Sequence, residues 1–326
     1  MNLLNLFEQL KANKLTAPYT VSPIEDMSGA FLGLDENGRP CIFITTEHDI
    51  NMPAIKTDKI KVEFSKKYKL LITKNTEEKI YNSILCLSSD LEDSKTFIVV
   101  MESILANIRG EITIQLLREM FQALVNLFSV KVEQDVLSAR RGLWAELFFM
   151  QQNEGFLFWA PLWHSEPTRT FDFSANGLRT EIKSTIRQER IHEFSHQQLI
   201  SIADERIIVV SYLLQEDDSG TSLQTLIDAA KAALKGTQYY IKLERAIRVV
   251  GMGEMSEQGP KFNGSYVTQN AGWFKSTDIP RFPINEPSGV SGTHYQSDLT
   301  QAPKLTQEQI SSWINDVRNA SEQLDS

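Results

Sequence analysis

The feature that most constrains the fold of this chain is the segment RTFDFSANGLRTEIK, residues 169–183. Asn176-Gly177 is the strongest short signal for a two-residue hairpin turn, because both central residues of such a turn take positive φ. With these two residues in the loop, Ala175 pairs with Leu178. The sequence therefore predicts a β-hairpin and also fixes which residues face each other across it.

Counting outward from the turn places Asp172 opposite Glu181 and Thr170 opposite Lys183. Side chains alternate along a strand, so these four share one face and the apolar neighbours share the other. Directly opposed residues have Cβ atoms about 5 Å apart, where two carboxylates repel unless a positive charge lies between them. Mg²⁺ suits this arrangement, because it takes few carboxylates and fills its octahedron with water and phosphate. Lys183 would then hold or polarise the attacking water beside the metal.

A second interpretation of the hairpin remains open. Any Glu-x-Lys sequence on a solvent-exposed strand places a carboxylate pair near a lysine without serving a function. The residues around the hairpin are what favour the metal site over this alternative.

Upstream, residues 135–152 have the pattern of a helix with Asp135 as its cap and apolar residues at helical spacing. Glu146 falls within that apolar pattern. A carboxylate on a core-facing stripe is costly unless it is paired or binds a metal. The two interpretations are therefore a functional carboxylate and a buried ion pair with Arg140 or Arg141.

Downstream, residues 206–214 contain the run Ile207-Ile208-Val209-Val210, which suits a central strand covered on both faces. A helix follows from Ser222 to about Lys235, and Gly236 ends it. The predicted order of elements is helix, strand, strand, strand, helix, strand, helix.

This order, with Glu146 on the first helix and Asp172 and Glu181-Ile182-Lys183 on the hairpin, resembles the core of the PD-(D/E)XK nucleases, which include many restriction endonucleases. Phe171 stands where the signature has proline. Related recombination nucleases carry a Gln and a Tyr on the helix after the hairpin; here Gln197-Gln198 lies in that region without a Tyr at the expected spacing. The resemblance covers about residues 135–235. Residues 279–295 further resemble the C-terminal part of an uncharacterised PD-(D/E)XK family found among bacterial defence genes.

The resemblance implies an α/β fold, with a restriction-endonuclease-like mixed sheet flanked by helices. It implies a Mg²⁺-dependent endodeoxyribonuclease, with Mn²⁺ as a substitute, in which Asp172 and Glu181 hold the metal and Lys183 positions the water. Glu146 would bind a second metal or order its water shell. The side chains expected to contact nucleic acid are Arg140, Arg141, Arg179, Arg187, Arg190, Gln197 and Gln198. For any one of these arginines, scattered surface charge is the alternative.

The expected setting is a bacterial restriction or anti-phage defence system. The expected partners are DNA, proteins of a defence operon and a second copy of the chain as a homodimer. A function from another class also fits, namely a catalytically inactive nucleic-acid-binding or scaffold subunit that keeps the nuclease-like fold.

Composition narrows the remaining choices. The 326 residues carry a net charge of −9, which argues against nonspecific coating of nucleic acid but permits a local basic groove. Only Cys41 and Cys86 occur, so neither a disulfide framework nor a zinc site is expected, and a cytoplasmic location fits. Neither a signal peptide nor a membrane span is expected, and the first ten residues have the pattern of a short amphipathic helix.

The regions outside the core complete the expected organisation. Residues 1–110 form a β-rich module, whose Lys66, Lys67 and Lys69 would contact nucleic acid or solvate a sheet edge. Residues 111–250 form the nuclease-like core, beginning with a helix at 111–128. Residues 251–326 form a loop-rich extension that ends in a helix. The strands expected in the first module are 30–34, 41–44, 59–64, 68–73 and 97–101.

Overall fold

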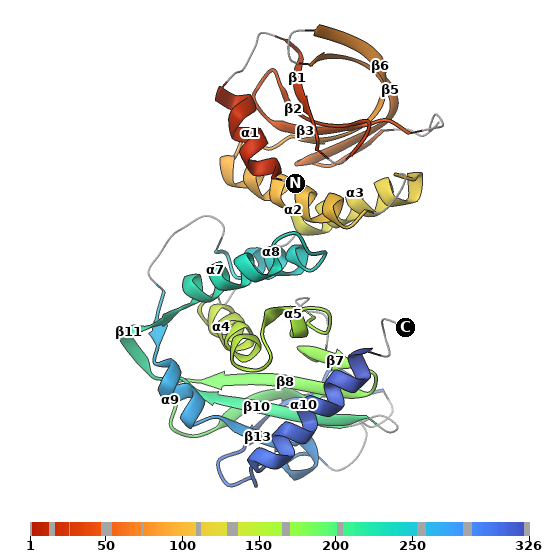
Figure 1. The fold of residues 1–326 in the computed structure, drawn as a ribbon. Coiled ribbons are helices and arrows are strands. Elements are labelled where there is room, and N and C mark those ends of the chain that lie inside the picture. Colours follow the sequence, from red (N-terminus) through yellow and green to blue (C-terminus); the bar gives the residue numbers. More distant parts are fainter. Residues whose placement is uncertain are drawn as a thin grey trace. The chain divides into compact units, whose positions relative to one another are not determined.

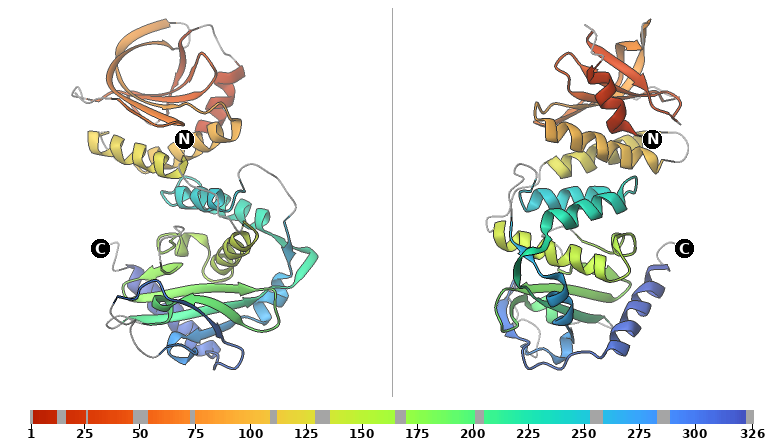
Figure 2. Two further views of the ribbon diagram at one scale, coloured as in Figure 1. Left: turned by 180° about the vertical axis from the view of Figure 1, so that it is seen from behind. Right: turned by 60° about the vertical axis from the view of Figure 1, so that its left-hand side comes forward.

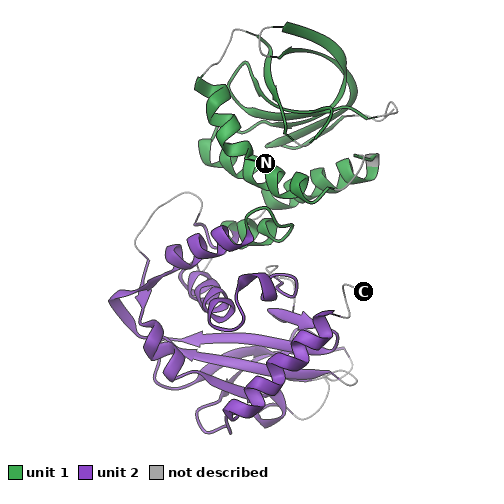
Figure 3. Ribbon diagram, viewed as in Figure 1, with its two compact units in different colours: residues 1–131, 235–248 green, residues 132–234, 249–326 purple. Residues whose placement is uncertain are grey.

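In the computed structural model, the described residues are 2–12, 17–25, 27–46, 54–72, 75–108, 112–128, 136–164, 170–200, 205–252, 259–282 and 289–322 (Figure 1). The chain divides into two compact units (Figure 3). Unit 1 contains residues 1–131 and 235–248, and unit 2 contains residues 132–234 and 249–326. These boundaries differ from the expected divisions at 110 and 250, because two helices from the expected core belong to unit 1.

Unit 1 contains a six-stranded sheet in the order β1-β2-β3-β6-β5-β4. Its strands are β1 (Tyr19–Pro23), β2 (Ala30–Asp35), β3 (Pro40–Ile44), β4 (Ile55–Lys56), β5 (Ile60–Ile72) and β6 (Asn75–Cys86). An additional parallel pairing joins β1 to β5, so the sheet curls round and closes on itself (Figure 2). The enclosed core includes Phe43, Tyr68 and Tyr81, whose rings meet edge to face.

The helices of unit 1 are α1 (Leu3–Ala12), α2 (Leu91–Ala106), α3 (Ile114–Phe128) and most of α8 (Tyr240–Val249). Arg248 on α8 forms a 2.8 Å ion pair with Asp93 on α2. The Asn107 side chain, just after α2, donates to the Gly236 carbonyl at 3.1 Å. These contacts tie residues 235–248 to unit 1, although they lie far along the chain.

Several expectations for the first module are confirmed. The first helix and the helix before residue 128 are present as α1 and α3. The strands expected at 30–34 and 41–44 are present as β2 and β3, which pair antiparallel around a turn with Gly38 at φ 78°. The strands expected at 59–64 and 68–73 are one strand, β5, whose register shifts between Glu63 and Lys66. The strand predicted at 97–101 is wrong, because these residues lie within α2.

Unit 2 is built on a four-stranded mixed sheet in the order β13-β10-β8-β7 (Figure 1). The strands are β7 (Phe173–Ala175), β8 (Leu178–Thr185), β10 (Arg206–Leu213) and β13 (Gly272–Lys275). Strands β8 and β10 are parallel, and the other two pairings are antiparallel. The expected mixed α/β fold flanked by helices is therefore confirmed.

Smaller elements surround this sheet. The helices are α4 (Val136–Gln152), α5 (Phe156–Trp159), α6 (His196–Leu199), α7 (Leu223–Leu234), α9 (Gly264–Gln269), the 3₁₀ helix η1 (Ser276–Asp278) and α10 (Gln307–Glu322). Two two-stranded sheets pair β9 (Ile191–Ser195) with β14 (His294–Asp298) and β11 (Glu216–Ser222) with β12 (Lys261–Phe262). Among the described residues, no helix is both long and apolar enough to cross a membrane.

The predicted core elements occur in their predicted order. Helix α4, strand β10 and helix α7 match the expected segments to within a residue or two, and the proposed cap Asp135 lies outside the described residues. The expected final helix is present as α10 and begins with a capping box, in which the Gln309 side chain accepts from Thr306 N at 2.9 Å. The region after residue 250 is more regular than expected, since it contributes β13 to the main sheet and β14 beside β9.

The hairpin register is confirmed. Ala175 pairs with Leu178 and Phe173 pairs with Thr180. Asn176 and Gly177 have φ values of 34° and 82°, the positive values that this turn requires. Strand β7 begins at Phe173, so Asp172 lies directly before it.

The two faces of β8 are covered by different elements. On one face, the Phe149 ring of α4 lies 5.2 Å from that of Phe173 and 5.6 Å from that of Trp273. Trp313 of α10 donates to the Thr180 hydroxyl at 3.2 Å. On the other face, Val209 packs in a cluster with Phe194 and Leu199. Glu181 pairs with Val209 in the parallel register, so Glu181 and Lys183 face β9 and α6.

Candidate active site

Glu181 is the most connected carboxylate of the predicted site. It is buried on β8, and its Oε1 accepts from Lys183 Nζ at 2.8 Å and from Gln198 Nε2 at 2.6 Å. Its Oε2 is also buried but has no hydrogen-bond partner among the described residues. Buried carboxylate oxygens without partners are rare and costly, so this atom has the capacity to bind a further positive group.

Asp172 is held beside Glu181 by a main-chain hydrogen bond. Its Oδ2 accepts from the backbone N–H of Ile182 at 2.7 Å, and that peptide directly follows Glu181. The Asp172 carbonyl accepts from His164 N at 2.8 Å, which fixes the backbone on the other side. The half-buried carboxylate is thus held in place from both directions.

Glu146 projects from α4 and is held by Trp163. The indole Nε1 donates to Glu146 Oε2 at 2.6 Å, and Trp163 also forms a β-bridge with Phe173. The alternative partners lie elsewhere: Arg140 donates to the carbonyls of Val250 and Gly251, and Arg141 donates to that of Leu137. The described contacts therefore do not support a buried ion pair between Glu146 and either arginine.

Lys183 lies on the same face as Glu181, as the register predicts. Its ammonium contacts Glu181 and donates to Gln198 Oε1 at 3.3 Å, above the Phe194 ring at 5.1 Å. Burial acts to lower the pKa of Lys183, but the charge of Glu181 and its hydrogen bond outweigh this, and the net pKa is raised. Lys183 is therefore a fixed positive charge near neutral pH.

The three carboxyl groups affect one another's ionisation. Burial raises the pKa of Glu146 to about 7; the Trp163 hydrogen bond opposes this rise, and the charge of Glu181 adds to it. Burial, followed by the charges of Glu181 and Glu146, raises the pKa of Asp172 well above its usual value. Burial also raises the pKa of Glu181, against the pull of Lys183. A bound cation would relieve this concentration of negative charge.

The donor chemistry fits Mg²⁺ or Mn²⁺. Among the described residues, no three His, Cys, Asp or Glu side chains are gathered into a ready-made metal cluster. Mg²⁺ does not require one, because it commonly binds through one or two carboxylates and keeps several waters. Asp172 and Glu181 are such a pair, and the unpartnered Glu181 Oε2 is an oxygen of the required kind.

The structure distinguishes the two predicted glutamines. Gln198 joins the site: besides Glu181 and Lys183, it donates to the Thr170 carbonyl at 2.9 Å. Its Oε1 also accepts from Ser195 N at 3.0 Å as part of the capping box that begins α6. Gln197 is exposed on the same helix. Gln198 is therefore held in one orientation and positions the Glu181 carboxylate and the Lys183 ammonium.

The predicted arginines do not form one group. Arg187 is exposed, and Arg179 forms a 2.6 Å ion pair with Glu205. Arg190 is buried, and it donates to the Ser211 carbonyl at 2.6 Å and to that of Asn270. This position gives Arg190 a structural role and leaves it no exposed surface for a phosphate. Arg140 and Arg141 line a separate pocket, described below.

Trp163 is a site residue that the sequence did not reveal. It lies outside the helix and hairpin patterns, and its contact with Glu146 spans 17 residues. The only available signal was that a carboxylate on an apolar stripe needs a partner. That signal indicates that a partner exists but does not identify it.

A known family matches most of this chain. The DUF4420 family, described as "Putative PD-(D/E)XK family member", matches residues 3–300. Neither the curated proteins nor the solved structures give a significant match. The matched region includes residues of both units, among them Glu146, Asp172, Glu181 and Lys183. The chain therefore belongs to the DUF4420 family.

Proposed function

We propose that this protein is a Mg²⁺-dependent nuclease that hydrolyses DNA phosphodiester bonds. The observation that carries the proposal is the environment of Glu181. One of its oxygens is held by Lys183 and Gln198, while the other is buried without a partner beside two further carboxyl groups. Structural ion pairs do not ordinarily leave such an atom, whereas a metal-binding carboxylate needs one.

In this proposal Asp172 and Glu181 hold the ion. When bound, Mg²⁺ would polarise the phosphate and lower the pKa of a coordinated water. The raised pKa of Lys183 keeps it protonated, so it stabilises negative charge on the reacting phosphate and does not act as a base. Hydrogen bonds with the Gln198 side chain hold the Lys183 ammonium and the Glu181 carboxylate in position. Glu146 orders water beside the ion or binds a second ion.

The exposed Arg187 and Gln197 are the proposed contacts to the DNA backbone near this site. Arg179 is a further candidate, although it would have to exchange Glu205 for a phosphate. Phosphate contacts make binding depend strongly on salt. DNA binding should therefore weaken steeply as the salt concentration rises, and neutral replacement of Arg187 should reduce that dependence.

Two variants test the roles separately. Glu181→Ala should lose both Mg²⁺ binding and cleavage, because it removes a metal ligand. Lys183→Ala should keep Mg²⁺ binding yet lose cleavage by about 10²-fold or more, because it removes only charge stabilisation. Isothermal calorimetry would measure ion binding, and nicking of supercoiled plasmid with Mg²⁺ or Mn²⁺ would measure cleavage. Glu216→Gln, an exposed carboxylate on β11, is the matched control and should match the wild type.

The second candidate function, an inactive nucleic-acid-binding or scaffold subunit, makes a different prediction. In that case the wild type binds no divalent ion, and both variants behave like it in every assay. That result, obtained with partner proteins present, would overturn the nuclease proposal.

The proposed setting is a bacterial restriction or anti-phage defence system, in which proteins of the same operon act with this chain. Family resemblance alone supports this part. The neighbouring genes test it, because a methyltransferase or an ATPase beside this gene is expected in such a system. Neighbours that are consistently unrelated to nucleic-acid metabolism would contradict it.

A further inference from the structure

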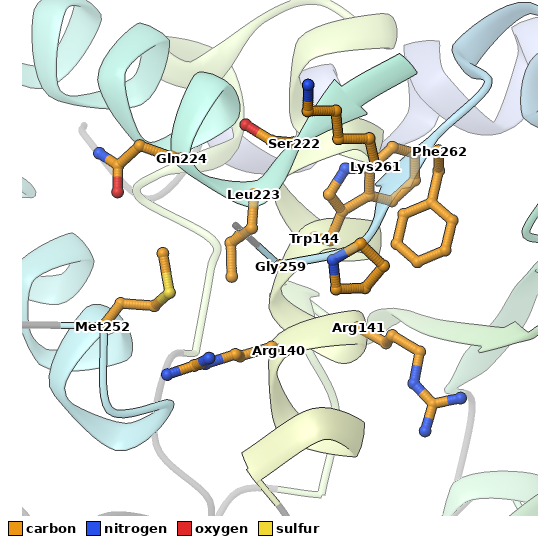
Figure 4. A pocket seen from close by; sticks show the side chains of 11 residues that line it. Arg140, Arg141, Trp144, Ser222, Leu223, Gln224, Met252, Gly259, Lys261 and Phe262 are labelled. Atoms are coloured by element: carbon orange, nitrogen blue, oxygen red, sulfur yellow. The ribbon is translucent and has the colours of Figure 1, made fainter. Parts of the chain in front are cut away.

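Unit 2 contains a second pocket, formed by α4, the start of α7 and β12 (Figure 4). Trp144 on α4 lines it, two residues before Glu146. Two residues correspond to a rotation of roughly 200° around a helix, so Trp144 and Glu146 project from opposite sides of α4. The pocket is therefore distinct from the carboxylate site.

The centre of the pocket is apolar. Leu223, Trp144 and Phe262 line it, and Phe262 lies beside Trp144 (Figure 4). The Trp144 indole N–H is occupied by the Thr221 carbonyl at 3.0 Å, and its ring meets that of Phe262 edge to face at 5.1 Å. The cavity measures about 230 Å³. An apolar cavity of roughly 150 Å³ holds a benzene, so this one has room for a larger planar ring system.

The rim of the pocket is cationic. Arg140, Arg141 and Lys261 line it, and none of its described lining residues is an Asp or a Glu. Main-chain carbonyls hold each cation. Arg140 donates to those of Val250 and Gly251. Arg141 donates to that of Leu137, and Lys261 donates to that of Asp218. Within the described part of the chain, none of the three pairs with a carboxylate. Three positioned cations without a carboxylate partner among the described residues, in a chain of net charge −9, favour an anionic ligand.

The directions of the cations restrict the ligand further. The side chains of Arg140 and Arg141 leave α4 in different directions, so their guanidinium groups lie apart (Figure 4). A single small anion would contact one of them and leave the cavity empty. A purely apolar ligand would fill the cavity but leave the cations unused. A nucleotide within a strand has the matching form, because a planar base lies between two phosphates.

We infer that this pocket binds a nucleotide, with the base in the apolar centre and the flanking phosphates against Arg140 and Arg141. Leu223 and Phe262 offer no donor or acceptor for a base edge and the Trp144 N–H is already occupied, so binding at these residues depends on shape and apolar contact more than on sequence. The nucleotide comes either from solution or from a strand with one base turned outward. The inference concerns binding alone and does not require cleavage.

Adenosine 3′,5′-bisphosphate is the probe for the free form, because it carries a purine between two phosphates. Calorimetry on the full chain without divalent ions should detect its binding. Arg141→Gln should weaken binding by about tenfold or more, the cost of one charge-assisted contact. Leu223→Trp should abolish binding by filling the cavity. Lys275→Gln removes an exposed cation elsewhere in unit 2 and should have no effect.

Glu181→Ala separates this inference from the proposed function. It should leave bisphosphate binding unchanged, because Glu181 belongs to the other site. If Glu181→Ala abolishes binding, or if binding requires Mg²⁺, the nucleotide occupies the carboxylate site and the inference is wrong. Absence of binding at millimolar concentration would also overturn it, whether or not the protein cuts DNA.

A second arm identifies the source of the nucleotide. The Glu181→Ala protein would be mixed with an oligonucleotide that carries one 2-aminopurine, whose fluorescence changes when it leaves the base stack. A fluorescence change that Arg141→Gln and Leu223→Trp remove, and Lys275→Gln keeps, supports the pocket and assigns the base to a strand. Bisphosphate binding with no such change supports the pocket and assigns the ligand to the free pool.

Discussion

At the scale of single residues, the candidate site consists of three carboxyl groups that repel one another and are held in place by hydrogen bonds. Asp172 is fixed by the Ile182 peptide, Glu146 by Trp163, and Glu181 by Lys183 and Gln198. None of these contacts removes the repulsion among the carboxyl groups, and all three have raised pKa values. Without a metal, the fixed geometry therefore costs stability.

Glu146→Gln measures this cost as a function of pH. The pKa of Glu146 is raised from 4.5 to about 7 in the folded chain. Below pH 4.5 the group is protonated whether the chain is folded or unfolded, so the variant should match the wild type. The wild type loses stability relative to the variant as pH rises from 4.5 to 7, and above pH 7 the difference in free energy of unfolding should reach on the order of 3 kcal/mol.

Urea unfolding in EDTA at pH 5 and pH 8 would measure the difference in free energy of unfolding. Gln can still accept from Trp163, so the comparison isolates the charge. The control variant Glu216→Gln should have the same free energy of unfolding as the wild type at pH 5 and at pH 8. An equal effect of Glu146→Gln at pH 5 and pH 8 would show that the carboxyl has an ordinary pKa.

At the scale of elements, the Asn176-Gly177 turn determines the geometry of the candidate site, because it sets the register of β7 and β8 that places Asp172 beside Glu181. Gly177 has φ 82°, and a Cβ added there would meet no atom within 4 Å. Gly177→Ala should therefore destabilise the chain by roughly 1 kcal/mol through backbone conformation alone. Gly142→Ala is the matched control: its Cβ would also meet nothing within 4 Å, but it lies within α4. That change should stabilise by roughly 0.5–1 kcal/mol. The denaturation midpoint should fall for Gly177→Ala and rise for Gly142→Ala. A lower midpoint for both variants would contradict the prediction.

Local patterns predicted the elements whose signals are contained within them. The Asn176-Gly177 pair gave the hairpin, and the apolar run at 207–210 gave β10. The run Phe97 to Met101 was misassigned because five consecutive apolar residues suit a strand, whereas α2 is buried on enough of its surface to accept them. Strand β6 begins with polar, exposed residues, so no apolar pattern marked its start.

In the candidate site, too, only the residues whose positions depend on a local pattern could be predicted. Asp172, Glu181 and Lys183 are related by one turn and could be placed from the sequence. Trp163 and the choice between Gln197 and Gln198 depend on contacts across 15 residues or more. Strands β13 and β14, of four and five residues, owe their conformation to pairing with β10 and β9, which no local signal records.

At the scale of the whole molecule, the two units are interleaved along the chain. Residues 235–248 leave unit 2, join unit 1 and return. In unit 1 the Arg248 guanidinium pairs with Asp93 and lies 4.5 Å from the Phe128 ring. Tyr240 and Leu243 on the same helix are buried. A single cut between the units therefore cannot yield two complete pieces.

Two truncations test this interleaving. A fragment of residues 132–326 should expose the apolar face of α8, bind a hydrophobic dye and self-associate. The same fragment with residues 235–248 replaced by a flexible Gly-Ser linker should remain monomeric and keep the metal affinity of the full chain. Size-exclusion chromatography and calorimetry would compare them. A well-behaved, monomeric first fragment would show that α8 does not need unit 1.

The position of Trp313 has a consequence for synthesis. On β8, the strand that carries Glu181 and Lys183, the Thr180 hydroxyl accepts a hydrogen bond from Trp313 of α10. The neighbouring strand β10 pairs with β13. Both α10 and β13 leave the ribosome after the carboxylates do, and unit 1 also waits for residues 235–248. A nascent chain therefore displays every proposed metal ligand before it has the frame that aligns them. A chain made in this order can align the candidate site only after the residues of α10 have left the ribosome.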